Sequence, residues 1–273
     1  MVRCATSGCQ HATPSPKGDA SQLFDPRGRL YDVSMATFVV VHGAWGGSHG
    51  FRSLRRLLQQ AGNEVFTPCL TGQGERSHLA RPDINLSTHV QDVVNAIWYE
   101  DLTDIVLVGH SYGGMVVTGV ADKVPERIQH LVFLDAFQPA DGQSLYSIAR
   151  GPNNSAPADD DWRVAPPVRK EAPNDPEVQW ARPRRHAQSR ATFEEAVKLS
   201  RPLEERSFTL TYLVASERAD PMSHFDQTAE RLRGNPRWTV RQLPGGHNMQ
   251  MTHPKELADM LLELFAGKVA VNA

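Results

Sequence analysis

From Met35 onward, short runs of apolar and β-branched residues alternate with longer amphipathic stretches. This alternation is typical of a parallel sheet whose buried strands are separated by helices that cover both faces. The predicted strands are Phe38–Val41, Glu64–Thr67, Ile105–Val108, Leu131–Leu134, Thr209–Val214 and Trp238–Leu243. The predicted helices are Phe51–Ala61, Thr88–Tyr99, Gly113–Lys123, Met222–Leu232 and Pro254–Phe265. The pattern therefore predicts an α/β fold with a mostly parallel sheet.

Polar and glycine residues mark the expected helix ends. Ser87 is the expected N-cap of the second helix, because its hydroxyl can accept a hydrogen bond from the first turn. The apolar stripe behind it consists of Val90, Val93, Val94 and Ile97. Gly62 and Gly267 stand where a helix C-terminus favours a residue in the left-handed conformation.

The alternation stops between about Phe137 and Pro202, where prolines are frequent and the acidic run Asp159-Asp160-Asp161 occurs. Proline disfavours continuous strands. The same segment carries more large side chains than a free linker would: Leu145, Tyr146, Trp162, Trp180 and Phe193. We therefore expect an inserted helical cap over residues 137–206, between core segments at 35–136 and 207–273.

Residues 1–34 are rich in Gly, Ser, Pro, Ala and charged residues, and show no helical or strand period. A segment of this composition buries too little apolar surface to offset the entropy of ordering. We expect a disordered or loosely attached tail. Met35 directly precedes the first strong strand, which suggests the hypothesis that the functional start is Met35. The tail has no continuous apolar segment of the kind found in secretory signals.

Charge and hydropathy exclude several classes of partner. The chain of 273 residues has 29 Lys and Arg against 31 Asp and Glu, with a pI near 6.6. This balance gives no broad electrostatic footprint for nucleic acid or an anionic membrane. No apolar stretch reaches the roughly 18 residues of a transmembrane helix. We expect a globular protein that binds neither nucleic acid nor membrane, and a homodimer is left open.

Three cysteines are too few, and odd in number, for a disulfide framework. Cys4 and Cys9 could pair or bind a metal, but the polar tail around them favours neither role. Cys69 follows a strand and is expected to be a core or sub-surface residue. This usage suits a reducing cytosol, so we expect a cytoplasmic location.

The predicted strand Ile105–Val108 runs directly into Gly109-His110-Ser111-Tyr112-Gly113, and a predicted helix follows. A G-x-S-x-G motif at a strand–helix junction is the arrangement of a nucleophile elbow, in which a strained turn lifts the serine hydroxyl clear of the sheet. The motif therefore predicts Ser111 as a nucleophile. His110 is expected to point away from the serine and to serve in packing.

Two further glycine-rich loops follow predicted strands. The first strand ends in His42-Gly43-Ala44-Trp45, a loop that can turn the main-chain N–H of Ala44 toward an oxyanion. A tight turn with no chemical role is the alternative. The second N–H would come from Tyr112, the residue after the nucleophile. The last strand ends in Pro244-Gly245-Gly246-His247, and this position favours His247 as the base.

The acid that would orient the histidine is open among three carboxylates. Asp135 ends the strand that follows the nucleophile's own strand, whereas Glu217 and Asp220 follow the next strand. A carboxylate among apolar neighbours is costly to bury unless it is paired, which favours Asp135. The polar run that holds Glu217 and Asp220 could simply be solvated. Both remain alternatives.

These motifs resemble those of α/β-hydrolases, over a stretch from about Met35 to Phe265. Within the fold family, the chain resembles small bacterial esterases related to plant methylesterases and hydroxynitrile lyases. It also resembles bacterial pyrethroid hydrolases. Four segments carry this resemblance: Phe38–Trp45, Leu70–Leu79, Gly109–Gly114 and Gly245–His247. The resemblance implies an α/β-hydrolase fold and a serine hydrolase that cleaves a carboxylic ester of a small to medium-sized molecule. It also implies Ser111 and His247 in their family positions, with no cofactor or metal.

The resemblance bears on the acid and on rival activities. Relatives of the plant type place an aspartate after the strand that corresponds to Thr209–Val214, and this chain departs from them because Glu217 and Asp220 are offset. Bacterial relatives carry Leu-Asp-Ala-Phe at the position of residues 134–137 and lack a fixed acid after the strand that corresponds to Thr209–Val214. Asp135 is therefore preferred.

Hydroxynitrile lyases of this branch carry a lysine after the catalytic histidine, where this chain has Asn248. The lyase activity is therefore disfavoured. A dinucleotide-binding reductase is disfavoured because no G-x-G-x-x-G is complete. A receptor-like ligand-binding member of the fold remains an alternative, as does a perhydrolase or thioesterase.

Overall fold

The structure is a computed structural model that describes residues 35–150, 161–167, 174–217 and 223–266, together with two short strands in the N-terminal segment. These strands, β1 (Gln22–Phe24) and β2 (Leu30–Asp32), pair antiparallel. We expected no strand period in residues 1–34. Strands of three residues are too short to produce a visible period in the sequence. Residues Met35–Phe265 form one compact unit.

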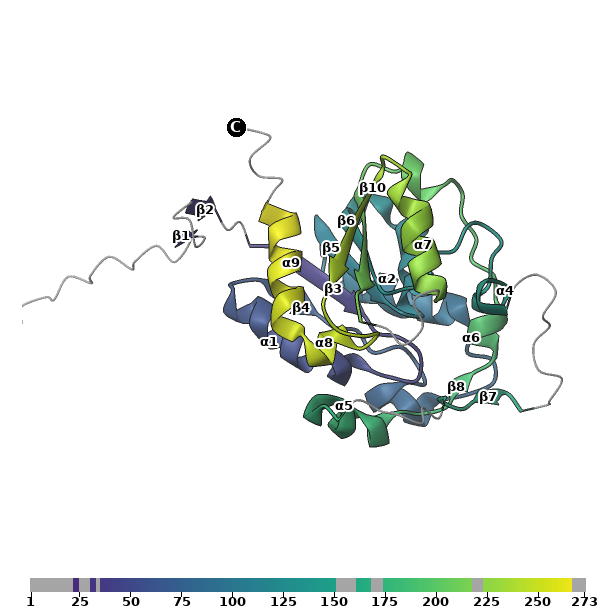
Figure 1. Ribbon diagram of the computed structural model, residues 1–273. Coiled ribbons are helices and arrows are strands. Elements are labelled where there is room, and N and C mark those ends of the chain that lie inside the picture. The colour runs from purple at the N-terminus through teal and green to yellow at the C-terminus, as the bar shows by residue number, and fades with distance from the viewer. Residues whose placement is uncertain are drawn as a thin grey trace, which may run out of the picture. The chain divides into compact units, whose positions relative to one another are not determined.

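A six-stranded parallel sheet forms the centre of this unit, in the order β10-β9-β6-β5-β3-β4 (Figure 1). Apolar β-branched runs form these strands because the side chains on both faces are buried. The prediction of a parallel sheet is confirmed. The strands are β3 (Thr37–Val41), β4 (Glu64–Phe66), β5 (Ile105–His110), β6 (Ile128–Leu134), β9 (Thr209–Ala215) and β10 (Trp238–Leu243).

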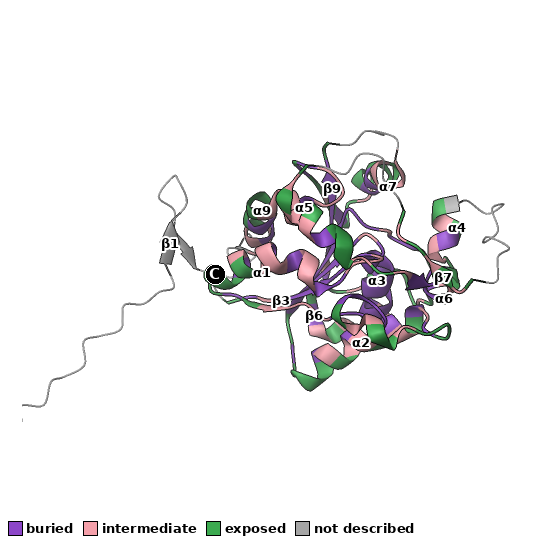
Figure 2. Cartoon of the chain, turned by 90° about the horizontal axis from the view of Figure 1, so that it is seen from below, coloured by how far each residue is buried: buried purple, intermediate pink, exposed green. Residues whose placement is uncertain are grey.

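Helices cover both faces of the sheet. Successive strand residues point to opposite sides, so Val39 and Leu107 pack in one apolar cluster and Phe38 and Val106 in the other. The first cluster contains α2 (Leu86–Tyr99), α3 (Gly113–Lys123) and α7 (His224–Arg233). The second contains α1 (Arg52–Gln60), the short α8 (Met249–Thr252) and α9 (Pro254–Ala266). Helix α3 is buried over most of its length (Figure 2). Within the described ranges, no helix is both long and apolar enough to cross a bilayer.

The proline-rich part of the chain contains only short elements where the structure describes it. Strands β7 (Arg163–Val164) and β8 (Gln188–Ser189) form an antiparallel pair of two residues each. Phe193 and Tyr146 from this segment are buried in the first apolar cluster, as expected of large side chains that are not in a free linker. The short helices are α4 (Leu145–Arg150), α5 (Pro176–Ala181) and α6 (Ala191–Glu194).

The observed end of one helix differs from the expected one. Helix α2 is capped by Asn85, not by Ser87: the Asn85 side chain accepts a hydrogen bond from the Thr88 amide, and the Thr88 hydroxyl accepts one from the Asn85 amide. Ser87 lies in the first turn, where its hydroxyl instead donates to Glu195 at 2.6 Å. Gly62 follows α1 with φ of +87°, as expected, and Gly267 lies outside the described residues.

The assignment of Asn85 as the N-cap of α2 can be tested by mutation. Replacing Asn85 by alanine leaves the Thr88 amide of α2 without its acceptor, so the free energy of unfolding should fall by about 1 kcal/mol. Urea titrations of the two proteins measure this difference. Ser87→Ala is the matched control and should cost less than about 0.5 kcal/mol, because the Ser87–Glu195 contact is exposed. A larger loss in Ser87→Ala than in Asn85→Ala would contradict the assignment.

Candidate active site

Three predicted site residues lie just beyond the carboxyl ends of three strands of the same sheet. Ser111 follows β5, Asp135 follows β6, and His247 lies in the loop after β10. In a parallel sheet these ends share one edge, where ligands of α/β proteins bind. The structure brings all three residues together at this edge.

A line of two hydrogen bonds joins these residues. The His247 Nδ1 atom lies 2.6 Å from Asp135 Oδ2, and Nε2 lies 3.0 Å from Ser111 Oγ. A carboxylate only accepts hydrogen bonds, so Nδ1–H donates to Asp135. Nε2 then carries the lone pair, and the Ser111 hydroxyl donates to it. This tautomer leaves Nε2 ready to take the hydroxyl proton.

The Asp135 side chain is fully buried, whereas the His247 side chain is 18% exposed. Besides His247, the main-chain amide of Ala215 donates to Asp135 Oδ1 at 3.1 Å. Burial of a carboxylate is tolerated only with such donors. Asp135 is thus the buried end of this chain of hydrogen bonds. Its other end opens on a cavity whose wall includes Ser111 and His247.

The two alternative acids do not share this geometry in the described chain. Glu217 has an exposed side chain, and its main-chain amide donates to the Gly245 carbonyl at 3.0 Å. Asp220 lies outside the described residues. The carboxylate in contact with His247 is that of Asp135.

Backbone strain is concentrated at this edge of the sheet. Ser111 has φ of +55° and Asp135 has φ of +46°, both in the left-handed region that residues with a Cβ rarely occupy. The Ser111 carbonyl accepts hydrogen bonds from the amides of Gly114 and Phe137 at 3.0 and 3.1 Å, which hold the turn. A Cβ on Gly113 would lie 2.6 Å from the Val41 carbonyl oxygen, so the elbow requires glycine there.

The loop after β3 lies against the serine. A Cβ on Gly43 would lie 2.8 Å from the Ser111 Cβ, so only glycine allows this approach. Ala44 lines the cavity. Within the described chain, the main-chain N–H groups of Ala44 and Tyr112 donate to no other protein group. Two amide donors near the serine are therefore available to a ligand.

His42 orients one of these amides. The ring is buried, its Nε2 accepts a hydrogen bond from the Leu70 amide at 3.1 Å, and its Nδ1–H therefore donates to the Gly43 carbonyl at 2.8 Å. The Gly43 carbonyl and the Ala44 N–H belong to one planar peptide unit and point in opposite directions. The ring that fixes the carbonyl thus also fixes the direction of the N–H.

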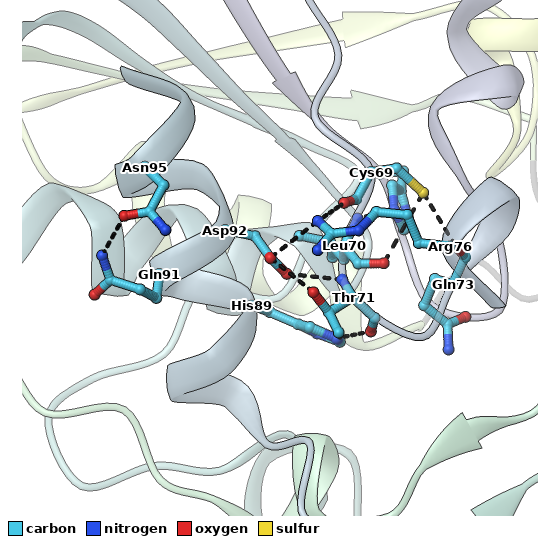
Figure 3. A network of polar contacts seen from close by, with 10 residues as sticks. Cys69, Leu70, Thr71, Gln73, Arg76, His89, Gln91, Asp92 and Asn95 are labelled. Atoms are coloured by element: carbon cyan, nitrogen blue, oxygen red, sulfur yellow. Dashed lines mark hydrogen bonds and ion pairs between the residues drawn. The ribbon is translucent and has the colours of Figure 1, made fainter. Parts of the chain in front are cut away.

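A second histidine, His89, connects residues 70–76, which also contact His42, to Tyr112. His89 Nε2–H donates to the Thr71 carbonyl at 2.9 Å, so its Nδ1 accepts from the Tyr112 hydroxyl at 2.8 Å. Asp92 in turn accepts from the Thr71 amide and from Arg76 (Figure 3). Residues 70–76 therefore support both Gly43–Ala44, through His42, and Tyr112, through His89.

His110 has the expected packing role, with its ring against that of Phe51, and it also borders the site. It is buried, but it lines the cavity, and its ring centroid lies 4.8 Å from that of His247. Its Nε2–H donates to the His247 carbonyl at 2.8 Å. Burial lowers the pKa of His110 to about 3, and lowers those of His42 and His89 to about 4. These rings are therefore neutral at neutral pH, and their hydrogen bonds keep one direction.

The cavity beside Ser111 has a volume of about 310 Å³. Its walls include Trp45 from the loop after β3 and Val178 and Ala181 from α5. Arg182 and Arg185 also line it. Sequence reasoning did not find the residues from the proline-rich segment, because no periodic pattern there indicates which side chains face the core. Among the described residues, no group of His, Cys, Asp and Glu has the arrangement of a metal site.

Comparison with known proteins identifies related sequences and structures. Residues 38–260 match the family described as the alpha/beta hydrolase family. The chain is 37% identical over 247 residues to the carbendazim hydrolyzing esterase of Nocardioides sp. (strain SG-4G), which covers 84% of this chain and 100% of that protein.

Two solved structures have the same fold. A methylesterase from Arabidopsis has a TM-score of 0.68 at 22% identity, covering 85% of this chain and 99% of that one. A pyrethroid hydrolase has a TM-score of 0.64 at 17% identity, covering 87% and 99%. The resemblance stated from the sequence, and the fold class, are confirmed.

The buried neutral histidines give a pH test. His42, His89 and His110 bind a proton near pH 6.5 in the unfolded chain but only near pH 3–4 in the folded one. The unfolded state therefore binds more protons between these values, and the free energy of unfolding should fall as the pH falls below 6.5. The expected loss between pH 7.5 and 5.5 is about 1.4 kcal/mol for each histidine.

Urea titrations at the two pH values measure this loss. His89→Gln should reduce it by about 1.4 kcal/mol. The control His78→Gln replaces an exposed histidine and should leave the loss unchanged. An equal loss in wild type and His89→Gln would show that His89 does not contribute.

Proposed function

The chain belongs to the alpha/beta hydrolase family and is an ester hydrolase, and we propose that it cleaves carboxylic esters of small to medium-sized molecules through an acyl-enzyme on Ser111. The observation that carries this proposal is the hydrogen-bonded line from buried Asp135 through His247 to Ser111, which ends at a cavity. An elbow serine with a histidine at 3.0 Å is the arrangement of an activated nucleophile.

Acylation begins with the Ser111 hydroxyl hydrogen-bonded to His247 Nε2. As Oγ attacks the ester carbonyl carbon, its proton passes to Nε2 and a tetrahedral intermediate forms. The Asp135 carboxylate stabilises the resulting imidazolium and holds its tautomer. Collapse of the intermediate breaks the bond to the alcohol oxygen, which takes the proton from Nε2. The acyl group then remains on Ser111.

The amides of Ala44 and Tyr112 stabilise the oxyanion in both tetrahedral intermediates. Each such donor typically contributes about 3–4 kcal/mol in the transition state. His42 acts as a positioning residue, because its bond to the Gly43 carbonyl fixes the peptide unit that carries the Ala44 N–H. His89 acts similarly through the Tyr112 hydroxyl.

Deacylation repeats the same steps with water. His247 Nε2 takes a proton from the water as its oxygen attacks the acyl carbon, and returns that proton to Ser111 Oγ as the acyl bond breaks. The products are a carboxylic acid and the regenerated serine. No cofactor takes part in this scheme. The relative from Nocardioides is named for hydrolysing carbendazim, so this compound belongs in a substrate panel beside simple aryl esters.

Residues 137–206 serve as the cap in this proposal, between core segments 35–136 and 207–273. The support is that Val178 and Ala181 contribute to the cavity wall, and that the Trp45 indole donates to the Val164 carbonyl at 2.8 Å. The proposed compartment is the cytoplasm, which suits a chain with three cysteines. Cys69 is a buried free thiol whose pKa burial raises to about 11, so it stays protonated.

The serine is tested by Ser111→Ala. Loss of the nucleophile should lower 4-nitrophenyl ester turnover by at least about a thousandfold and abolish labelling by a fluorophosphonate, with little change in the melting temperature. Ser87→Ala, an exposed serine, is the control and should retain both. Labelling that persists on another serine in Ser111→Ala would contradict the assignment. Ligand binding without turnover in the wild type would indicate a receptor-like protein instead.

The acid is tested by comparing three variants. Asp135→Asn should lower kcat by about a thousandfold to ten-thousandfold, because an amide favours the wrong tautomer of the imidazole. Glu217→Gln and Asp220→Asn should each stay within about tenfold of wild type. Steady-state kinetics and melting temperatures are measured for all three. A lower melting temperature with kcat retained in Asp135→Asn would mean that Asp135 only stabilises the turn.

A further inference from the structure

The cavity that holds Ser111 and His247 has an uneven distribution of charge. Arg182 and Arg185 line it, and no carboxylate does so among the described residues. The rest of the wall is largely apolar or neutral, with Trp45, Phe51, Val178 and Met251 as its larger apolar members. A neutral ester would need no cation in such a wall.

The positive charge comes from one segment of the cap. Between Val178 and Phe193 the chain contains Arg182, Arg184, Arg185 and Arg190 but no Asp or Glu. This segment begins in α5, which is fixed to α1 by a bidentate ion pair: Arg52 donates to the two carboxylate oxygens of Glu177 at 2.7 and 2.9 Å. The arginines that follow therefore come directly after a helix that is fixed to α1.

Two neighbouring arginines already have partners. The guanidinium of Arg52 lies 3.5 Å from the ring centroid of Trp180, and that of Arg184 lies 4.0 Å from the same ring. Arg184 also donates to the Trp180 carbonyl. Cation–π contacts and the Glu177 ion pair thus account for both side chains. Neither residue lines the cavity.

Arg182 differs from them. Its side chain is exposed at the cavity and makes no hydrogen bond or ion pair with any residue that the structure describes. Arg185, beside it in the wall, lies 5.8 Å from the ring centroid of Trp45. A guanidinium and an aromatic ring together form a surface that suits a planar group with a negative charge.

We propose that Arg182 and Arg185 form a subsite for a negatively charged group of the substrate. The preferred substrates are then carboxylic esters whose non-reacting part is apolar or aromatic and ends in an anion such as a carboxylate. This inference rests on the proposed ester hydrolysis at Ser111. The apolar wall takes the body of the molecule, and the two guanidinium groups take its charged end.

The test compares two esters that differ in charge. 4-Acetoxybenzoate is an anion, and 4-acetoxybenzamide is its neutral analogue of similar size. At low salt, kcat/KM for the anion should exceed that for the amide by about tenfold, and the ratio should fall in about 0.5 M salt. In the double variant Arg182→Gln/Arg185→Gln the ratio should fall to about one. Arg201→Gln removes an exposed arginine that does not line the cavity, so it should keep the wild-type ratio.

Calorimetric binding to Ser111→Ala separates this inference from the proposed function. The anionic ester should bind about tenfold more tightly than the amide, and the preference should disappear when both arginines are also replaced. Hydrolysis of both esters at equal kcat/KM in the wild type would overturn the subsite and leave the ester hydrolase intact. Binding that favours the anion, without turnover of either ester, would support the subsite and contradict the proposed function.

Discussion

A carboxylate that is fully removed from water imposes the main constraint on this site. Asp135 has no exposed side-chain area, and an unpaired charge in that position would cost several kcal/mol. Donors from two separate elements meet this requirement, the ring of His247 after β10 and the amide of Ala215 at the end of β9. The loop that carries His247 is thereby fixed to the middle of the sheet, and its second ring nitrogen is directed at Ser111.

Neutral histidines fix the orientation of groups at the cavity through hydrogen bonds to the core. A neutral imidazole has one donor and one acceptor, so a ring with two fixed partners has only one consistent tautomer. His42 and His89 each join residues 70–76 to a different part of the site in this way. Because burial keeps both rings neutral, the direction of these contacts does not change with moderate changes in pH. The two free amides therefore have a defined orientation before any ligand binds.

The sheet and its covering helices could be predicted from the sequence, because strands buried on both faces give apolar runs that few other structures produce. The motif at Ser111 and the position of His247 predicted that these residues meet, whereas the carboxylate in contact with His247 could only be ranked among three, because a single sequence does not show which strand ends lie together. The N-cap of α2 is Asn85, whereas the sequence predicted Ser87. Neighbouring polar residues compete for this position, and tertiary contacts decide between them.

The cavity wall could not be predicted. Arg182 and Arg185 lie in a proline-rich segment without periodicity, and their position depends on a contact between Arg52 and Glu177, which are far apart in the sequence. Such pairings leave no pattern that a single sequence can reveal.

The attachment of α5 has a consequence for the way in which stability is distributed. The sheet is stabilised by apolar burial, which salt weakens little, whereas α5 is held to α1 by an ion pair and by cation–π contacts to Trp180. Local detachment of this helix and global unfolding therefore depend on different forces. Ionic strength therefore affects local detachment of α5 more than global unfolding of the sheet, so the two stabilities can vary independently.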